Sequence, residues 1–397
     1  MTFSAFRDVI CTKTGEHFSG DVLRNLSPAG APFFAGYDLE KAAKTLQRNA
    51  MAGRPWSMWR YHEVLPAPTP AAMVSLGEGM TPLIETARLG ASLGVPDLHI
   101  KDEGRNPTGS FKDRGMSVAM TMLKSLGASH LIIPTAGNAG GSAAAYAARA
   151  GIAIDVLIPK DAPAANRDEC RRAGANVTLV DGFLDECGRR ASAIAQEKGW
   201  FELSTFKEPY RVEGKKTMAY ELAEQMAGGL PDVIIYPTGG GTGLVAMWKA
   251  FAELEALGWI GSERPRMISV QAEGCAPLVK AFDAGLETAA HWAAATTRVS
   301  GLRAPKVLAD ALCLRAIRES GGSAIAVPDA DMFDFVRRAG SLEGLNVCPE
   351  GAACLSAIPE LLRRGDLDRG EQVVVFNTAT SHKYADLLSE MEPANGG

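Results

Sequence analysis

The sequence of 397 residues lacks the features that mark several classes of protein. It has no unbroken apolar stretch of the roughly 20 residues that a membrane-spanning helix needs. Residues 1–8 also lack the basic and then apolar layout of a signal peptide. A formal net charge of −5 leaves no basic surface for nucleic acid or an anionic membrane. We therefore expect a cytoplasmic protein whose partner is a small molecule.

Cysteine and histidine are few and scattered. The six histidines form no H-x-x-x-H pattern, and none lies at metal-ligand spacing from a cysteine. The seven cysteines contain no C-x-x-C pair; they are Cys11, Cys170, Cys187, Cys275, Cys313, Cys348 and Cys354. We predict reduced, mostly buried thiols and no metal site.

The pattern that is present is typical of an α/β protein. The chain is 46% hydrophobic and 22% charged, and its length suggests two or three domains. Short β-branched runs alternate with alanine-rich segments, which predicts mainly parallel sheets covered by helices. Strands are expected at 99–103, 130–134, 154–159, 177–180, 233–237, 268–272, 324–327 and 372–377. Helices are expected at 116–126, 142–150, 164–173, 184–198, 214–226 and 244–257.

The first 60 residues differ from this pattern. They indicate an irregular, turn-rich extension that contains one helix from Tyr37 through Gln47. A proline-rich connector follows at 66–70, and the loop at 76–83 leads into the first compact part of the chain.

Lys112 lies in a turn-forming stretch, residues 107–115, between an expected strand and an expected helix. The positive end of the helix dipole disfavours a cation there and favours the neutral amine. A neutral amine suits a lysine that must form a Schiff base. The alternative is a solvated lysine in a helix cap, because Ser110 and Asp113 are close to a capping box.

A second loop, residues 135–142, follows the expected strand at 130–134 and leads directly into an alanine-rich helix. Small residues and exposed amides at a helix start form an anion site that suits a carboxylate. The side chain of Asn138 can both donate and accept hydrogen bonds. The alternative is a tight turn with Asn138 in a left-handed conformation.

A third loop, residues 238–243, follows the expected strand at 233–237 and contains Gly239, Gly240, Gly241 and Gly243. Ordering four glycines on folding costs chain entropy, so their presence indicates that the loop needs exposed backbone amides. The usual ligand of such amides is a phosphate. No Gly-Lys-Ser/Thr follows, which disfavours a nucleoside-triphosphate loop. Residues 241–246 match the dinucleotide fingerprint only loosely, because the next acid, Glu273, follows after about 30 residues instead of about 20. A flexible turn is the alternative.

The last expected strand leads into hydroxyl-bearing residues, 378–383. Such a cluster at a strand end can hydrogen-bond a neutral ring nitrogen, and it can equally be a polar loop.

A lysine, an anion loop, a phosphate loop and a terminal hydroxyl are together the contacts that pyridoxal phosphate needs. With these motifs the chain resembles the threonine synthase family and, more broadly, the tryptophan-synthase-β-like (fold type II) group of pyridoxal-phosphate enzymes. The resemblance spans about residues 56–385. It is carried by 106–116, 136–140, 210–217, 237–244 and 349–353, and by Trp59-Arg60-Tyr61 with Leu65-Pro66.

The resemblance implies a role for each matching residue. Pyridoxal 5'-phosphate would form an aldimine with Lys112, which would also carry protons, and Phe111 would contribute to the cofactor site. Asn138 would bind the phenolic oxygen, and Thr378 would face the pyridine nitrogen, where a hydroxyl makes a milder electron sink than a carboxylate. The phosphate would be held by Gly239, Gly240, Gly241, Thr242 and Gly243. The substrate carboxylate would be bound by Thr135, Ala136 and Gly137, and the substrate's own phosphate by Arg211.

The chain also departs from the family pattern. Cys11 stands alone where relatives often carry paired cysteines, so a zinc-binding ancestry is lost. Residues 378–383 have lost two glycines of the family's Thr-Gly-Ser/His-Gly-Leu-Lys and place His382 beside the cofactor. The stretch 203–206 lacks the Asn-Ser pair that some synthases use for the substrate phosphate.

The leading hypothesis is a threonine synthase-like lyase that converts O-phosphohomoserine and water to threonine and phosphate. One alternative on the same scaffold is a serine or threonine deaminase or a β-replacement synthase, with His382 as an extra acid or base. Another is a nucleotide-binding protein without catalysis, against which the Lys112 motif argues.

The resemblance further implies two doubly wound α/β domains with the cofactor in the cleft between them. We expect an N-terminal extension at 1–60, a larger domain at 61–103 and 201–397, and a smaller mobile domain at 104–200. The resemblance also implies a homodimer, because members of this family are usually homodimers.

Overall fold

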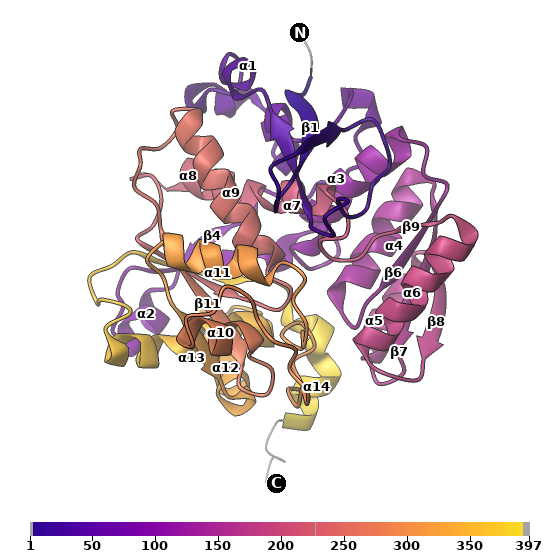
Figure 1. Ribbon diagram of the computed structural model, residues 1–397. Coiled ribbons are helices and arrows are strands. Elements are labelled where there is room, and N and C mark those ends of the chain that lie inside the picture. Colours follow the sequence, from indigo (N-terminus) through magenta and orange to yellow (C-terminus); the bar gives the residue numbers. More distant parts are fainter. Residues whose placement is uncertain (1–2, 227, 392–397) are drawn as a thin grey trace. The chain divides into compact units, whose positions relative to one another are not determined.

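The computed structural model describes residues 3–226 and 228–391 (Figure 1). Contacts divide the chain into two compact units. Unit 1 comprises Met1–Met80, Asn106–Gly229 and Val245–Glu263, and unit 2 comprises Thr81–Arg105, Leu230–Leu244 and Arg264–Gly397. The domain bounds expected from the sequence, at 60, 103 and 200, stay a prediction.

Unit 1 begins with a small antiparallel sheet where the sequence suggested an irregular extension, so that expectation was wrong. Its strands are β1 (Phe6–Cys11), β2 (His17–Ser19) and β3 (Phe33–Tyr37), in the order β2-β1-β3. The sheet buries Val9, Cys11 and Phe33 in a small core of its own. The expected helix at 37–47 contracts to α1 (Leu39–Ala43), where the Asp38 side chain accepts a hydrogen bond from the Lys41 amide at 2.9 Å.

The second sheet of unit 1 is parallel, with the strand order β8-β7-β6-β9. Its strands are β6 (His130–Pro134), β7 (Ala153–Pro159), β8 (Asn176–Val180) and β9 (Phe201–Glu202). Alternate residues face opposite sides of a strand. Leu131 and Ile133 therefore join a core with α3 (Lys112–Ser125) and α4 (Asn138–Ala150), whereas Ile132 packs with α6 (Leu184–Lys198). Figure 1 shows these helices beside the magenta strands.

The remaining elements of unit 1 are mostly helical. They are the 3-10 helices η1 (Arg48–Gly53), η2 (Met58–Val64) and η3 (Pro70–Ala72), and the α-helices α5 (Ala164–Arg172), α7 (Tyr210–Lys215), α8 (Thr217–Gln225) and α9 (Thr242–Ala256). The first three residues of α9 belong to unit 2.

Unit 2 contains a six-stranded sheet with the order β12-β11-β10-β13-β5-β4. All its pairings are parallel except that of β4 with β5 at one edge. The strands are β4 (Leu83–Glu85), β5 (Leu98–Asp102), β10 (Val233–Pro237), β11 (Arg266–Ala272), β12 (Ala324–Val327) and β13 (Val373–Asn377). The α/β fold with mainly parallel sheets that the sequence predicts is therefore confirmed.

Helices cover both faces of this sheet, as a parallel sheet requires. Val233, Ile235, Val373 and Val375 pack with α2 (Ala87–Leu93), α12 (Asp329–Glu343) and α13 (Pro349–Arg364) in one core. The alternate residues Ile234 and Val374 are also fully buried. The remaining elements of unit 2 are η4 (Glu103–Arg105), α10 (Pro277–Asp283), α11 (Asp310–Glu319), η5 (Ser381–Tyr384) and α14 (Ala385–Met391).

Two helix boundaries differ from the sequence expectation in a way that matters for the site. Helix α3 begins at Lys112 instead of residue 116, and α4 begins at Asn138 instead of residue 142. The expected helix at 214–226 is two helices, α7 and α8, which meet at Lys216. Lys112 and Asn138 are thus the first residues of their helices.

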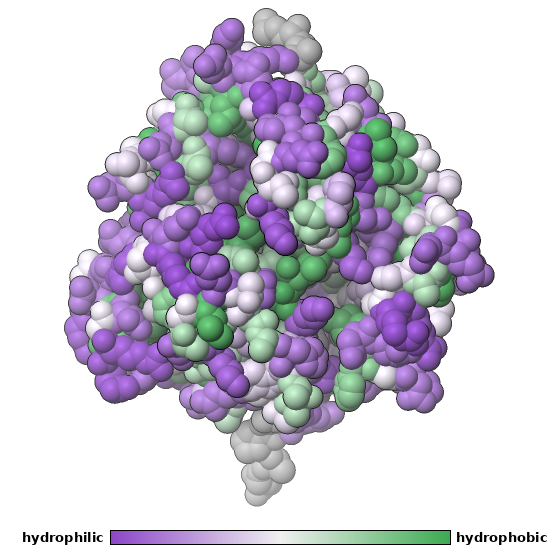
Figure 2. All heavy atoms as spheres, viewed as in Figure 1, coloured by the Kyte–Doolittle hydropathy of each residue, from purple (hydrophilic) through white to green (hydrophobic). Residues whose placement is uncertain are grey.

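The described surface is mostly polar. Figure 2 shows hydrophilic residues spread over the visible face, with hydrophobic residues in small groups between them. Among the described residues no helix has the length and apolar character needed to cross a membrane.

Candidate active site

Lys112 occupies the start of α3. Phe111 is the N-cap residue, with φ −59° and ψ −11°, and gives the helix no side-chain cap. The Lys112 side chain is half-buried, and its Nζ lies 4.2 Å from the centre of the Phe111 ring. A cation over an aromatic face is attracted by the ring quadrupole, so Phe111 helps to fix the position of the amine.

Asp113 fastens the turn before Lys112, in a different way from the expected capping box. Its carboxylate accepts hydrogen bonds from the amide and hydroxyl of Thr108, both at 2.6 Å, and from the Ser142 hydroxyl at 2.6 Å. The Ser110 hydroxyl does not cap the helix; it is buried without a hydrogen-bond partner. Because Ser142 lies on α4, Asp113 also ties the first turn of α3 to that of α4. Burial raises the pKa of Asp113 to about 6.

The anion loop leads into α4 as predicted. Thr135 and Ala136 are buried, and the Thr135 hydroxyl donates to the carbonyl of Gly137 at 3.0 Å. Gly137 is the N-cap residue of α4, so the loop ends at amides that have no partner within the helix. Asn138 has a helical position and does not belong to the residues with positive φ. The alternative of a left-handed asparagine turn is therefore wrong.

Arg211 lies on α7, which packs closely on α3. A Cβ atom added to Gly115 would approach the Arg211 carbonyl oxygen to 2.7 Å, so glycine is needed there. The Arg211 side chain is fully buried. Its Nη1 donates to the carbonyl of Leu203 at 2.9 Å, while its Nε is 3.9 Å from Oε1 of Glu208 and makes no hydrogen bond. The starts of α3, α4 and α7 thus come together within unit 1.

The glycine loop lies in unit 2, between β10 and α9. Added Cβ atoms would overlap Gly301 O at Gly239, Cys313 Sγ at Gly241 and the Tyr236 hydroxyl at Gly243. Gly241 also has φ +75°, a conformation that favours glycine. Three of the four glycines are therefore required by the packing of the loop, which excludes the reading of a merely flexible turn. Gly240 is the more open residue of the four.

Thr378 follows β13, also in unit 2. It is buried, and its Oγ1 lies 3.8 Å from Sγ of Cys348. Cys348 is the N-cap residue of α13, and its amide donates to the Asn377 side chain at 3.0 Å. His382 is exposed on η5.

The sequence assigns no part in the site to several neighbours of these residues. Lys215 and Glu208 are fully buried beside Arg211, and Ser110 precedes Phe111. In unit 2, Glu350 accepts a hydrogen bond from the Gly301 amide at 3.1 Å and so holds the segment that packs against Gly239. A polar residue in a helical stretch looks the same whether it is buried or exposed, so only the packing reveals these groups.

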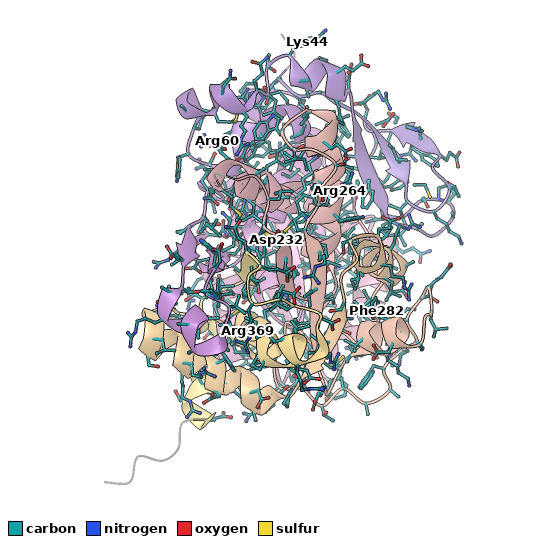
Figure 3. The ribbon with its side chains drawn as sticks, turned by 90° about the vertical axis from the view of Figure 1, so that its left-hand side faces the viewer. Lys44, Arg60, Asp232, Arg264, Phe282 and Arg369 are labelled. Carbon is teal, nitrogen blue, oxygen red and sulfur yellow. The ribbon has the colours of Figure 1, made fainter. Side chains whose placement is uncertain are left out.

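A surface cavity of about 780 Å³ in unit 2 contains none of the predicted site residues. It is lined by Arg338, Arg363 and Arg369 among others, and Figure 3 labels Arg369. Arg363 lies in the last turn of α13 and Arg369 contacts the carbonyl of Gly94, which caps α2. Cations are stabilised at helix C-termini. The positions of these two arginines are therefore explained without assuming a bound ligand.

Residues 74–379 match the family model of the pyridoxal-phosphate dependent enzymes. The chain therefore belongs to this family. It is a lyase with pyridoxal 5'-phosphate as its cofactor, as the motifs predict.

Threonine synthases are among its relatives. Threonine synthase of Methanocaldococcus jannaschii is 34% identical over 377 residues, which cover 95% of this chain and 93% of the relative. The predicted resemblance to threonine synthases is thus confirmed.

Solved structures of other members share the fold. Maize serine racemase matches with a TM-score of 0.67 at 22% identity, covering 78% of this chain and 91% of that chain. The processed form of threonine deaminase isoform 2 from Solanum lycopersicum matches with a TM-score of 0.67 at 19% identity, covering 96% of this chain and 99% of that chain.

The residues present fit the cofactor. Lys112 is a half-buried residue that supplies an amine at a helix start, and the buried hydroxyl of Ser110 two residues earlier has a hydrogen bond still to make. The loop at 239–243 has the small, close-packed backbone that brings amides up to a phosphate. A phosphate group at the start of α9 would also be stabilised by the helix dipole.

Proposed function

We propose that the chain is a threonine synthase, which converts O-phosphohomoserine and water to threonine and phosphate. The observation that carries this proposal is Lys112 at the start of α3, with Asp113 linking that turn to the anion loop and α7 packed against it. The 34% identity to a threonine synthase over 95% of the chain supports the choice of substrate.

In this proposal, each residue acts through the group that the fold presents. Lys112 forms the Schiff-base linkage and moves protons through Nζ, and Phe111 positions that amine. The amides of residues 239–243 bind the cofactor phosphate, Asn138 binds its phenolic oxygen, and Thr378 faces its ring nitrogen. Residues 135–137 bind the substrate carboxylate at the start of α4, and Arg211 binds the substrate phosphate. The cofactor, when bound, supplies the electron sink for the chemistry.

Water exclusion is a second task of the same residues. Thr135, Ala136, Arg211 and Thr378 are buried, so the polar groups they offer act at low dielectric, where hydrogen bonds and charges are strong. Because Lys112 is half-buried, substrate can reach this residue while part of it is shielded from water.

A deaminase or β-replacement synthase is the second candidate function. It is favoured by the stretch 203–206, Leu203-Ser204-Thr205-Phe206, which has no Asn-Ser pair for a substrate phosphate. Such an enzyme would need no second phosphate site. Release of phosphate from O-phosphohomoserine therefore discriminates the two.

The test uses the purified holoenzyme and its Lys112→Ala variant. We expect a visible absorbance band from the Schiff base, and both threonine and phosphate from O-phosphohomoserine. Lys112→Ala should lose the band and about 10³-fold or more of the activity, because the linkage and the proton carrier are both removed. Lys124→Ala is the control, because Lys124 is exposed in the last turn of the same helix.

Two outcomes would contradict the proposal. A band that persists in Lys112→Ala would refute the role of Lys112. A band in the wild type without phosphate release would point to the second candidate and a β-substituted amino acid.

A further inference from the structure

Gln271 is a fully buried polar residue near the carboxyl end of β11, in unit 2, and the site described above gives it no task. Its Nε2 donates to the carbonyl oxygen of Thr238 at 3.0 Å. Its Oε1 accepts from the amides of Leu278 at 2.8 Å and Val279 at 3.2 Å, both on α10, which lies beside β11 (Figure 1). One side chain thus joins the first residue of the glycine loop to the start of α10.

The start of α10 fixes the orientation of the Gln271 amide. Ala276 is the N-cap residue of α10 and gives the helix no side-chain cap, so the Oε1 atom of Gln271 serves the first amides of the helix instead. Rotation of the side-chain amide by half a turn would set its NH₂ group against these amides and its oxygen against the Thr238 carbonyl. The Nε2 atom is therefore held toward Thr238.

The hydrogen bond to Thr238 also sets the direction of the next amide in the loop. A trans peptide group is planar, so its C=O and the N–H of the following residue point in opposite directions. The carbonyl of Thr238 and the amide of Gly239 belong to one such group, which is trans. By holding the carbonyl, Gln271 directs the Gly239 N–H away from itself.

Packing fixes other features of the loop. Added Cβ atoms would overlap neighbouring atoms at Gly239, Gly241 and Gly243, which explains why these residues are glycines. Glycine, however, has wide freedom in φ and ψ, so a peptide group beside it can rotate unless its polar atoms are held. The Thr238 amide donates to the carbonyl of Val270 at 2.8 Å and holds the residue on one side, and Gln271 holds its carbonyl on the other.

We propose that Gln271 is a positioning residue for the cofactor. It holds the peptide group between Thr238 and Gly239 so that the Gly239 amide donates a hydrogen bond to the phosphate group of pyridoxal 5'-phosphate. No covalent bond is made or broken in this role. The inference rests on the proposed function in one respect, that residues 239–243 bind the phosphate, and it does not depend on the choice of substrate.

The test compares the binding of pyridoxal 5'-phosphate with that of pyridoxal, which has no phosphate group. Each compound is titrated into the full-length protein freed of cofactor, and the visible absorbance band of the Schiff base gives the dissociation constant. Gln271→Met has a side chain of similar length that cannot donate to Thr238. It should bind pyridoxal 5'-phosphate about 10-fold or more weakly than the wild type and pyridoxal equally well, because only the contact with the phosphate is misplaced.

Two further variants complete the test. If Gln271→Met does not fold, Gln271→Glu replaces it, because a carboxylate still accepts from the amides of α10 but cannot donate to Thr238. The control is Gln372→Met, at the amino end of β13, which loses a hydrogen bond to Asp97 in the same sheet. It should lower stability without changing the ratio of the two dissociation constants. Phosphorus NMR of the holoenzymes gives a second readout, because the signal of the bound phosphate should shift in the Gln271 variant and not in the control.

The outcomes separate this inference from the proposed function. Equal losses of affinity for both compounds, or no loss for either, would overturn the role of Gln271, even if threonine is formed. A loss confined to pyridoxal 5'-phosphate, in a protein that does not turn over O-phosphohomoserine, would support Gln271 and overturn the synthase. Wild-type protein that binds both compounds equally tightly would overturn both Gln271 and the phosphate loop.

Discussion

A single residue, Asp113, links the turn that carries Lys112 to helix α4, which begins at Asn138. Its carboxylate is fully buried and accepts three hydrogen bonds, two from Thr108 and one from Ser142. Hydrogen bonds lower the pKa of a carboxylate, and burial raises it. Burial is the larger effect here, so the pKa of Asp113 rises from 3.8 to about 6.

This shift has a consequence for stability against pH. Because the folded pKa lies above the unfolded one, the native state binds the proton more tightly between about pH 4 and pH 6. The stability that Asp113 contributes is therefore present below pH 4 and is lost as the pH rises through 6. A shift of about two pH units corresponds to about 3 kcal/mol in the free energy of unfolding.

We expect Asp113→Asn to remove this dependence. Relative to that variant, the apoenzyme should lose about 3 kcal/mol in unfolding free energy between pH 4 and pH 7. Urea midpoints at several pH values measure the difference. Asp181→Asn, whose side chain is 85% exposed, should run parallel to the wild type. If the urea midpoint of Asp113→Asn also changed with pH in parallel with that of the wild type, Asp113 would have an ordinary aspartate pKa and the prediction would be wrong.

Among the elements, α3 and α7 depend on glycine where their backbones meet. At Gly214 an added Cβ would overlap the Arg114 carbonyl oxygen, which belongs to α3 and cannot move like a side-chain end. Gly188 of α6, in contrast, has open space around the position of its Cβ and no positive φ. Replacement by alanine should therefore have opposite effects at the two positions: destabilising at Gly214 and stabilising at Gly188.

We expect Gly214→Ala to separate the two helices, with a loss of about 1–3 kcal/mol in stability, as is usual for overpacking against rigid neighbours, and a fall in phosphate affinity. Gly188→Ala should stabilise the protein by up to about 1 kcal/mol, because alanine favours the helix. Thermal unfolding and calorimetry with inorganic phosphate provide both measurements. If Gly214→Ala matched Gly188→Ala, the contact of α3 and α7 would not be as close as described.

Sequence reasoning succeeded for elements whose signal is local. The strands β6, β10 and β12 were predicted at their observed bounds, because a buried parallel strand is a continuous apolar run between turn residues. The three loops after strands were found because glycines, amides and hydroxyls directly follow such runs. The strands β1 to β3 were missed; of these, β2 has three residues and is too short to show alternation.

Lys215 and Glu208 could not be recognised in the same way. Their burial results from the packing of α7 on α3, two segments that are far apart in the sequence. Lys215 and Lys216 are adjacent lysines in the sequence, yet one lies beside Phe111 and the other pairs with Glu213 and Glu253. Only the tertiary structure distinguishes the surroundings of these two lysines.

At the scale of the whole molecule, the first residues of the chain are fastened to segments much later in the sequence. The Ala35 amide and the Tyr37 hydroxyl of β3 donate to the two oxygens of Glu213, at 3.1 and 2.9 Å. Glu213 also binds Lys216 at 2.8 Å and Lys249 at 3.0 Å. The N-terminal sheet is thus an integral part of unit 1, anchored on a buried ionic cluster.

Glu213→Gln tests this anchor. Its amide nitrogen cannot accept from Tyr37 or pair with a lysine, so Lys216 and Lys249 would share Glu253 alone. Removing one partner from a buried ion pair costs about 3–5 kcal/mol, which should lower the urea midpoint and hasten tryptic cleavage after Lys13 and Arg24. Glu186→Gln is the control, because Glu186 pairs with arginines on the exposed face of α6, where the loss of an ion pair should leave the urea midpoint nearly unchanged. Equal midpoints for both variants would show that the N-terminal sheet is held by its apolar contacts and not by the cluster.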